Sequence, residues 1–247
     1  MLIPEVIIVA LDDMTVSRAL EVARRVAGRR GVWGVKMNAL LAEKTAGNII
    51  SEVKDCGVQV MVDRKIHEIP RSAANWVRRD FEAGADMMTV HASGHIEMMR
   101  AAIDAARDEG RRADILAVTA LTSLDDEACM DVFNTESKGT VLRLGNLAMR
   151  ADVDGVVCSV KEVALMRGLR RPDTQAGSTT GFRLRVVPAI RPLWYGSPGD
   201  DQRRIGTPRR ALDDGATHLV IGTPFFKNGD FLENIDRTVE EIYGIAA

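Results

Sequence analysis

The sequence predicts a (β/α)8 barrel, and three features of the chain lead to this prediction. Short apolar runs rich in β-branched residues alternate with longer segments of helical periodicity. Eight such runs occur, each almost continuously apolar, as in parallel strands buried on both faces. The length of 247 residues suits eight β–α units closed into a barrel. A doubly wound open sheet is the competing fold, but it is usually smaller, and no G-x-G-x-x-G motif follows the first run.

The strands and helices are expected to alternate in order along the chain. Strands are predicted at Val6–Leu11, Gly31–Lys36, Val58–Asp63, Asp86–His91, Ile115–Thr119, Gly155–Cys158, Leu184–Val187 and His218–Ile221. Helical periodicity predicts helices over Val16–Gly28, Ala39–Asp55, Pro70–Ala83, Ile96–Asp108 and Phe231–Tyr243. Several helical segments end at a glycine, the usual residue after the last helical turn. No change in composition divides the chain, so one domain over residues 1–247 is expected.

Composition excludes several classes of protein. Apolar residues make up 46% of the chain and charged residues 28%, which permits a large core and excludes intrinsic disorder. The net charge of −2 gives no basic excess that would attract nucleic acids or anionic membranes. Three cysteines, Cys56, Cys129 and Cys158, are an odd number without short spacing, which favours reduced thiols in the cytoplasm. Neither a signal peptide nor an apolar run of about 18 residues is present, so a soluble cytoplasmic protein is expected.

Two connections stand out by their turn-forming residues. The segment Arg170–Phe182 is expected to be a surface connection. The longer segment Pro192–Gly206 follows the seventh predicted strand, and loops at this place in a barrel commonly bind phosphate or close over a ligand. Two large aromatic residues, Trp194 and Tyr195, lie in this otherwise polar loop. They either close over a ligand or pack the loop onto the barrel.

Charged residues cluster where the predicted strands end, which is where barrels carry their active sites. The ionisable residues at these ends are Asp12, Lys36, Asp63, Lys65, His91 and Arg191. Asp63 and Lys65 are two positions apart, so the period of a strand sends both side chains to the same side. With Glu68 they predict a cluster of alternating charge: Lys36, Asp63, Lys65 and Glu68. Such a cluster is either a network of salt bridges at the rim or a catalytic site that keeps its lysines protonated.

The histidines, Cys158 and the methionines near the fourth strand are expected to have structural rather than catalytic roles. His67 and His91 do not have the spacing of metal ligands, so no metal site is expected. His91 is expected to hydrogen-bond backbone groups at its strand end. Cys158 is interpreted as a small buried hydrophobic residue, and the methionines near the fourth strand as core.

The segment from Asp63 to Pro70, DRKIHEIP, resembles the D-x-K-x-x-D-I-P motif of the orotidine 5′-monophosphate decarboxylase family. Further resemblances follow in order along the whole chain, at positions that match the strand ends of that family. They are VALD at Val9–Asp12, GVK at Gly34–Lys36, TVHASG at Thr89–Gly94, VTALTS at Val118–Ser123, VPAIRP at Val187–Pro192 and DQRRIGTP at Asp201–Pro208. The chain is thereby identified as a divergent member of this family.

The resemblance implies a barrel of the ribulose-phosphate-binding type and a cofactor-free reaction in pyrimidine biosynthesis, from orotidine 5′-monophosphate to uridine 5′-monophosphate. It implies that Lys36, Asp63, Lys65 and Glu68 are catalytic, with Lys65 as the cation and proton donor at the carbanion. It implies that the substrate is bound by Asp12, Ser123, Pro188, Arg191, Gly222 and Thr223. In the family, the second acid of the motif reaches across a two-fold interface, so a homodimer with shared active sites is expected, Glu68 completing the partner's site.

Three positions depart from the family pattern. Glu68 replaces an aspartate, Gly222-Thr223 replaces Gly-Arg, and Leu193 or Trp194 stands where a loop glutamine is usual. Arg191 or Arg203 could supply the cation for the phosphate instead. Two other functions stay open at this point. One is a metal-dependent sugar-phosphate decarboxylase of the 3-keto-gulonate 6-phosphate type, and the other is a non-catalytic paralogue that only binds a nucleotide.

Overall fold

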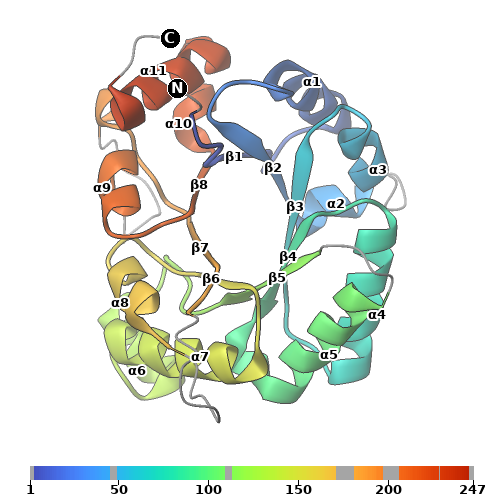
Figure 1. Cartoon of the computed structure of the whole chain (residues 1–247), viewed down its shortest axis with the longest axis vertical. Helices are drawn as coiled ribbons and strands as arrows, with labels where there is room; N and C mark the ends of the chain where they lie inside the picture. Colours follow the sequence, from blue (N-terminus) through green and yellow to red (C-terminus); the bar gives the residue numbers. More distant parts are fainter. Residues whose placement is uncertain are drawn as a thin grey trace.

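A computed structural model of the chain has eight parallel strands that close into a barrel in sequence order, with helices around the outside (Figure 1). The structure describes residues 3–44, 49–108, 113–170, 181–196, 206–227 and 229–244. The predicted (β/α)8 barrel is confirmed. The strands are β1 (Ile7–Ala10), β2 (Val32–Asn38), β3 (Gln59–Ile66), β4 (Met87–His91), β5 (Asp114–Val118), β6 (Gly155–Val157), β7 (Leu184–Val187) and β8 (His218–Ile221).

All eight strand predictions are confirmed, with ends that differ by a few residues. The largest differences are at β2, which runs to Asn38 instead of Lys36, and at β3, which runs to Ile66 instead of Asp63. Both extensions lie at the carboxyl ends of the strands. The extension of β3 contains the charged residues Arg64 and Lys65, and that of β2 ends in the polar Asn38, so the apolar run ends before the strand does.

The helical layer is made of short and medium helices. They are α1 (Val16–Val26), α2 (Ala39–Ala42), α3 (Ile49–Lys54), α4 (Pro70–Glu82), α5 (His95–Arg107), α6 (Asp126–Phe133), α7 (Ser137–Ala151), α8 (Val163–Gly168), α9 (Pro208–Asp213), α10 (Thr223–Lys227) and α11 (Phe231–Tyr243), with 3₁₀ turns η2 (Ala92–Gly94) and η3 (Leu193–Tyr195). The prediction of one helix over Ala39–Asp55 is wrong, because α2 and α3 are separate helices. The sequence between them contains Gly47 and Asn48, both weak helix formers.

Two apolar layers hold the barrel together, and adjacent residues of one strand belong to different layers. Ile8 and Ala10 of β1 lie in a cluster with interior residues of other strands, whereas Ile7 and Val9 pack in the larger cluster with the helices. The interior cluster is Ile8, Ala10, Met61, Met87, Leu116, Leu184, Val186 and Val220. Since both strand faces are buried, the near-continuous apolar runs of the sequence are explained.

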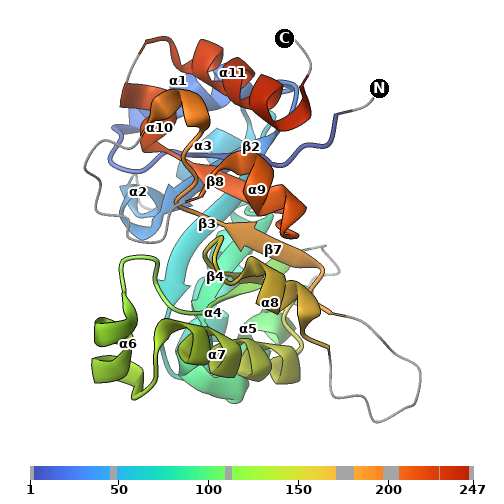
Figure 2. The ribbon, with the colours of Figure 1, turned by 90° about the vertical axis from the view of Figure 1, so that its left-hand side faces the viewer.

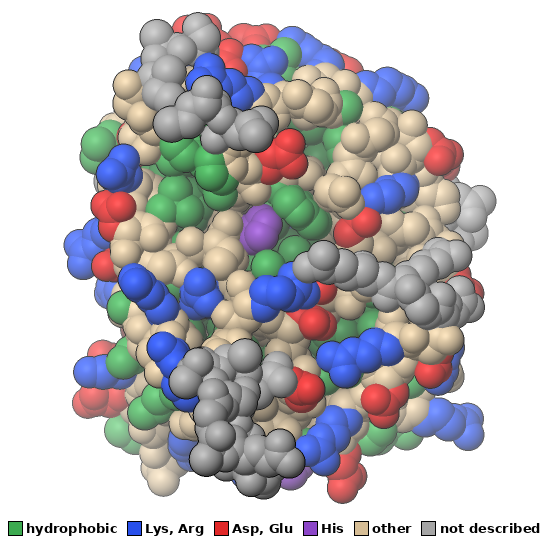
Figure 3. All heavy atoms as spheres, in the orientation of Figure 1, with side chains coloured by type: hydrophobic (Ala, Val, Ile, Leu, Met, Phe, Trp, Pro, Cys, Tyr) green, Lys and Arg blue, Asp and Glu red, His purple; other side chains and the backbone are tan. Residues whose placement is uncertain are grey.

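The two ends of the barrel differ in what they carry. In the side view of Figure 2, the arrows of β3 and β7 point toward the side where α2 and α6 lie, and both chain termini are on the other side. Figure 3 shows that acidic and basic side chains are interspersed on the face seen in Figure 1, in keeping with a net charge of −2. Within the described ranges, no helix is long and apolar enough to cross a membrane. None of the cysteines forms a disulfide.

Candidate active site

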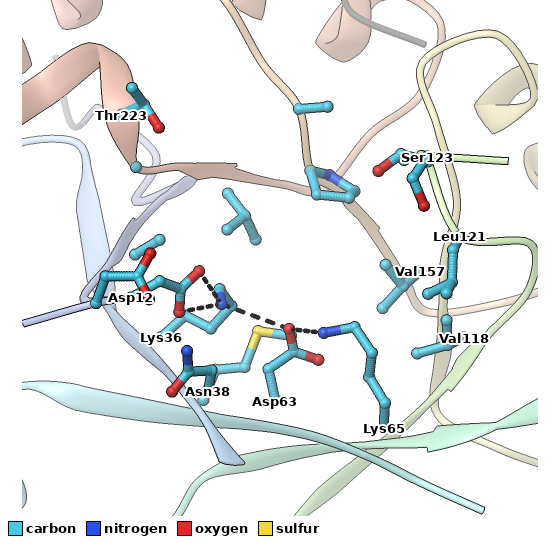
Figure 4. A pocket seen from close by; sticks show the side chains of 18 of the residues that line it. Asp12, Lys36, Asn38, Asp63, Lys65, Val118, Leu121, Ser123, Val157 and Thr223 are labelled. Carbon is cyan, nitrogen blue, oxygen red and sulfur yellow. Dashed lines mark hydrogen bonds and ion pairs between the residues drawn. The ribbon is translucent and has the colours of Figure 1, made fainter. Parts of the chain in front are cut away.

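Charged side chains from three neighbouring strands meet at the carboxyl end of the barrel. Lys36 on β2 is only 6% exposed, and its Nζ atom lies 2.7 Å from Oδ1 of Asp12, which follows β1. The same Nζ lies 3.4 Å from Oδ2 of Asp63 on β3. Figure 4 shows Lys36 between these two carboxylates, with Lys65 on the far side of Asp63. The predicted alternation of charge is therefore present, in the order Asp12, Lys36, Asp63, Lys65.

Asp63 and Lys65 form the closest pair of this cluster, with Lys65 Nζ 2.6 Å from Asp63 Oδ2. Both face the barrel mouth, but regular strand alternation is not the reason. The pairing of β3 with β4 shifts between Val62 and Ile66, and Lys65 has a φ of 51°. The segment between these two paired positions is thus a bulge, which re-aims side chains at the end of a strand.

Opposite charges in this cluster shift the pKa values of Lys36 and Asp63 toward their ionised forms. Burial alone lowers the pKa of Lys36, but the carboxylates of Asp63 and Asp12 outweigh it and raise that pKa above its ordinary value. Burial alone raises the pKa of Asp63, yet the charges of Lys36 and Lys65, with hydrogen bonds from Lys65 and Thr89, hold that pKa below its ordinary value. At neutral pH both groups are therefore ionised.

A cavity of about 1120 Å³ opens above this cluster. Nine of the ten residues predicted for the site line it: Asp12, Lys36, Asp63, Lys65, Ser123, Pro188, Arg191, Gly222 and Thr223. They lie at or just after the carboxyl ends of six different strands, which is how a barrel assembles a site. Its walls mix polar and apolar groups, as in a pocket for an organic ligand with charged substituents.

Glu68 is the predicted site residue that the barrel does not bring to this cavity. The prediction that Glu68 joins Lys36, Asp63 and Lys65 in one cluster of the same chain is wrong, because Glu68 is exposed and does not line the cavity. It lies between the end of β3 and Pro70, the first residue of α4, and its backbone N–H points to Met98. Asp12 provides the second carboxylate of the cluster instead.

Among the further residues that line the cavity and that were not predicted for the site are Arg18, Asn38, Thr122, Phe226 and Lys227. Asn38 lies two positions after Lys36 on the same strand, and Thr122 lies in the VTALTS segment, so both had a local signal. Arg18 on α1 and Lys227 on α10 had none, because only the closure of the barrel brings helices from opposite ends of the chain to one rim.

Two other expectations are resolved by geometry. The ring of His91 forms no hydrogen bond with the described residues; its ring centroid lies 5.6 Å from that of His67, so the backbone role expected for it is wrong. Trp194 donates a hydrogen bond to Thr238 on α11 at 3.1 Å, and Tyr195 is buried. These aromatics therefore pack the loop onto the barrel. The described residues contain no group of three or more His, Cys, Asp or Glu that could hold a metal ion.

A profile of the Orotidine 5'-phosphate decarboxylase / HUMPS family matches residues 5–238. The chain belongs to this family. As a member of the Orotidine 5'-phosphate decarboxylase / HUMPS family, it is 37% identical to the Orotidine 5'-phosphate decarboxylase of Paramagnetospirillum magneticum over 240 residues, which are 95% of this chain and 97% of that protein. It is 36% identical over 240 residues to the enzyme of that name from Pseudomonas putida, covering 96% of this chain and 97% of that protein.

Solved structures agree with this membership of the Orotidine 5'-phosphate decarboxylase / HUMPS family. The Orotidine 5'-phosphate decarboxylase from Lactobacillus acidophilus superposes with a TM-score of 0.77 at 26% identity, covering 97% of this chain and 99% of that one. An uncharacterised conserved protein from Geobacillus kaustophilus superposes with a TM-score of 0.74 at 30% identity, covering 96% and 99%. The similarity thus extends over the entire barrel rather than over a single motif.

Proposed function

We propose that this chain decarboxylates orotidine 5′-monophosphate to uridine 5′-monophosphate without a cofactor. The observation that carries the proposal is the ion pair of Lys65 with Asp63, at 2.6 Å between Nζ and Oδ2, which lines a cavity large enough for a nucleotide. The family profile over residues 5–238 and the full-length relatives support the same reaction.

In the proposed reaction, the bond between C6 of the pyrimidine and its carboxyl carbon breaks, and CO2 leaves. The electron pair stays on C6 as a carbanion. The ammonium of Lys65 stabilises this negative charge and then transfers a proton from Nζ to C6, which forms the C–H bond of the product. Lys65 afterwards regains a proton from solvent. Asp63 accepts a hydrogen bond of 2.6 Å from Nζ of Lys65 and so positions the ammonium for this transfer.

Lys36 and Asp12 are proposed to hold the ribose and to position Asp63. Lys36 donates hydrogen bonds of 2.7 and 2.8 Å to the two oxygens of Asp12 and is ion-paired with Asp63. The Asp12 side chain is 40% exposed toward the cavity rim, so it keeps acceptor capacity for a hydroxyl group of a ligand. The base is proposed to lie against Ser123 and Pro188, which line the cavity wall beyond Lys65.

The phosphate is proposed to bind at the opposite rim, at Gly222 and Thr223. No arginine follows β8 in this chain, but Arg191, Arg18 and Lys227 also line the cavity. They carry the positive charge that a phosphate dianion requires. Arg203, the other cation proposed from the sequence, lies outside the described residues.

We also propose that the protein works as a cytoplasmic homodimer in which Glu68 enters the partner's site. Glu68 is exposed in the single chain, and its neighbour Ile69 is 67% exposed. Leu40, at the start of α2 on the adjoining rim, is 68% exposed. A second copy seated here would cover these apolar side chains and bring Glu68 toward a second cavity.

The test is a decarboxylation assay in which the loss of ultraviolet absorbance follows the conversion of orotidine 5′-monophosphate. Turnover that persists in excess chelator is the expected result, since no step uses a metal ion. Binding of uridine 5′-monophosphate without any turnover of the substrate would contradict the proposal and identify a nucleotide-binding paralogue. Turnover of a sugar phosphate alone, lost on chelation, would contradict it in favour of the metal-dependent decarboxylase.

A further inference from the structure

Arg64 lies between the two residues that form the closest pair of the site, but its side chain takes the opposite direction. Asp63 and Lys65 line the cavity, whereas Arg64 is absent from its lining and its side chain is only 5% exposed. Arg64 is therefore buried behind the strand, between the barrel and its helical layer.

The guanidinium of Arg64 is held on every side. It forms a two-pronged ion pair with Asp80 of α4, through Nε and through Nη2 at 2.9 Å from Oδ1. Nη2 also lies 2.7 Å from Oε1 of Glu43, just after α2. The guanidinium carbon lies 4.4 Å from the centre of the Trp76 ring. Planar pairing with a carboxylate combined with stacking on an aromatic ring fixes both the position and the rotation of an arginine head.

Asp80 is as deeply buried as its partner. Its side chain is 1% exposed, and among the described residues its ion pair is with Arg64. Burying two opposite charges contributes little net stability compared with an apolar pair of similar volume. An ion pair in this place is therefore better explained by the geometry that it imposes than by the stability that it adds.

The segment that this ion pair anchors is the bulge at the end of β3. Val62 pairs with Met88 and Ile66 with Val90, so four steps along β3 correspond to two along β4. Within the bulge, Lys65 has a φ of 51°, a conformation that is unfavourable for residues other than glycine. Such a conformation persists only where the surroundings hold it in place.

We propose that Arg64 is a positioning residue that, through its ion pair with Asp80, holds the bulge of β3 so that Lys65 and Asp63 face the substrate. The expected effect on kcat rests on the proposed decarboxylation. The expected effect on the conformation of the bulge does not. Arg64 touches neither the cavity nor the reacting atoms. It acts by holding the bulge in the one conformation in which Nζ of Lys65 lies 2.6 Å from Oδ2 of Asp63.

The variant that tests this proposal is Arg64→Met/Asp80→Leu. It removes both buried charges together, so no uncompensated carboxylate remains, as it would in Arg64→Met alone. Arg64→Lys is the second variant, because it keeps the charge beside Asp80 but loses the planar two-pronged pairing. The matched control is Arg79→Met. Arg79 also pairs with Glu43, at 3.1 Å, and lies over the same Trp76 ring, but it is on α4 and does not belong to the bulge.

Two measurements are made on each variant. Hydrogen exchange of the Lys65 amide, which donates to buried Thr89 at 2.9 Å, reports the bulge without any substrate. We expect faster exchange in Arg64→Met/Asp80→Leu and in Arg64→Lys, at an unfolding free energy close to that of the unaltered protein. We further expect kcat for orotidine 5′-monophosphate to fall about 10- to 100-fold in the double variant and less in Arg64→Lys, with KM changed less than threefold. Arg79→Met is expected to leave both measurements unchanged.

Wild-type exchange at Lys65 in both variants would overturn the proposal, whatever the activity. Faster exchange with wild-type kcat would also overturn it, because the bulge would then move without consequence for the reaction. Absence of turnover in the unaltered protein would instead contradict the proposed function, and the exchange of the Lys65 amide would still decide whether Arg64 holds the bulge.

Discussion

The hydroxyl of Thr89, on β4, donates a hydrogen bond of 2.8 Å to Oδ1 of Asp63, on β3. The hydroxyl oxygen of Thr89 in turn accepts a hydrogen bond of 2.9 Å from the backbone N–H of Lys65. Thr89 is fully buried and supports the bulge of β3 from the inner side of the barrel, opposite to Arg64. A single hydroxyl thus orients the carboxylate of the site and satisfies a backbone donor in an unusual conformation.

Replacing Thr89 by valine should therefore lower both stability and turnover. Thr89→Val keeps the shape but leaves the Lys65 amide without its acceptor, which we expect to cost about 1–3 kcal/mol of unfolding free energy. Turnover should fall at least about tenfold, since each ~1.4 kcal/mol lost at the transition state is a factor of ten. Urea unfolding and kcat measure the two effects. Thr89→Ser retains the hydroxyl and serves as the control, and equal kcat for all three proteins would refute the orienting role.

Lys65→Ala should abolish turnover while the barrel stays folded. Lys65 is the cation that faces the cavity beside Asp63, and the carbanion has no other proton donor in the proposed reaction. The Lys65 side chain is 39% exposed and belongs to neither apolar cluster, so its truncation leaves the core undisturbed. Circular dichroism and kcat are the measurements. A folded variant with near-normal turnover would exclude Lys65 from the role of proton donor.

Thr223→Arg, which restores the residue usual in the family, should lower KM and leave kcat nearly unchanged. A phosphate contact acts remotely from the pyrimidine, so it contributes mainly to binding. The specificity of the gain is checked with product: uridine 5′-monophosphate should bind more tightly to the variant, while uridine, which has no phosphate, should bind equally to both. Weaker binding of the nucleotide would mean that this rim accommodates another group.

Lys65→Ala and Glu68→Ala should complement each other in mixed dimers. If Glu68 serves the partner's site, one site of a mixed dimer loses both residues and the other is intact. With random association about half of the dimers are mixed, so activity should recover to roughly a quarter of the unaltered protein. The two variants are unfolded and refolded together and then assayed, with mass spectrometry to verify mixed dimers. Mixed dimers without activity would assign Glu68 to its own chain or to no site.

The stability of the barrel should depend on pH through His218, at the start of β8. Burial, with the nearby charge of Arg183, lowers the pKa of His218 from 6.5 to about 4. Between these values the unfolded chain binds the proton more readily than the folded one. The contribution of His218 to the free energy of unfolding is therefore fully present above pH 6.5. It is lost as the pH is lowered toward 4, and the loss is at most about 3 kcal/mol.

The variant His218→Phe should remove this part of the pH dependence and keep a ring in edge contact with Trp33, where the two rings are now 5.5 Å apart. Urea unfolding at several pH values between 4 and 6.5 measures the slope. His91, whose pKa burial also lowers, contributes a slope of the same sign in both proteins. An unchanged slope in His218→Phe would show that His218 does not titrate as proposed.

Hydrophobic periodicity was sufficient to predict the barrel, because each strand is a local run of residues buried on both faces. Once the strands are in order, their carboxyl ends meet at one rim, so Lys36, Asp63 and Asp12 could be expected near one another from the sequence. The same reasoning failed for the helix over Ala39–Asp55 and for Glu68. In both cases the outcome depends on how the chain leaves the strand end, which periodicity does not describe.

The sequence by itself determined the barrel, the rim that carries the site and nine of the side chains that line the cavity, since these follow from local pattern and strand order. Only the tertiary structure decided how the site is held. The shift in pairing between β3 and β4, the ion pair of Arg64 with Asp80 and the support by Thr89 join residues 16 to 26 positions apart. The physical reason is that a buried ion pair or a bulge depends on which elements pack against each other. Local periodicity carries no information about that packing.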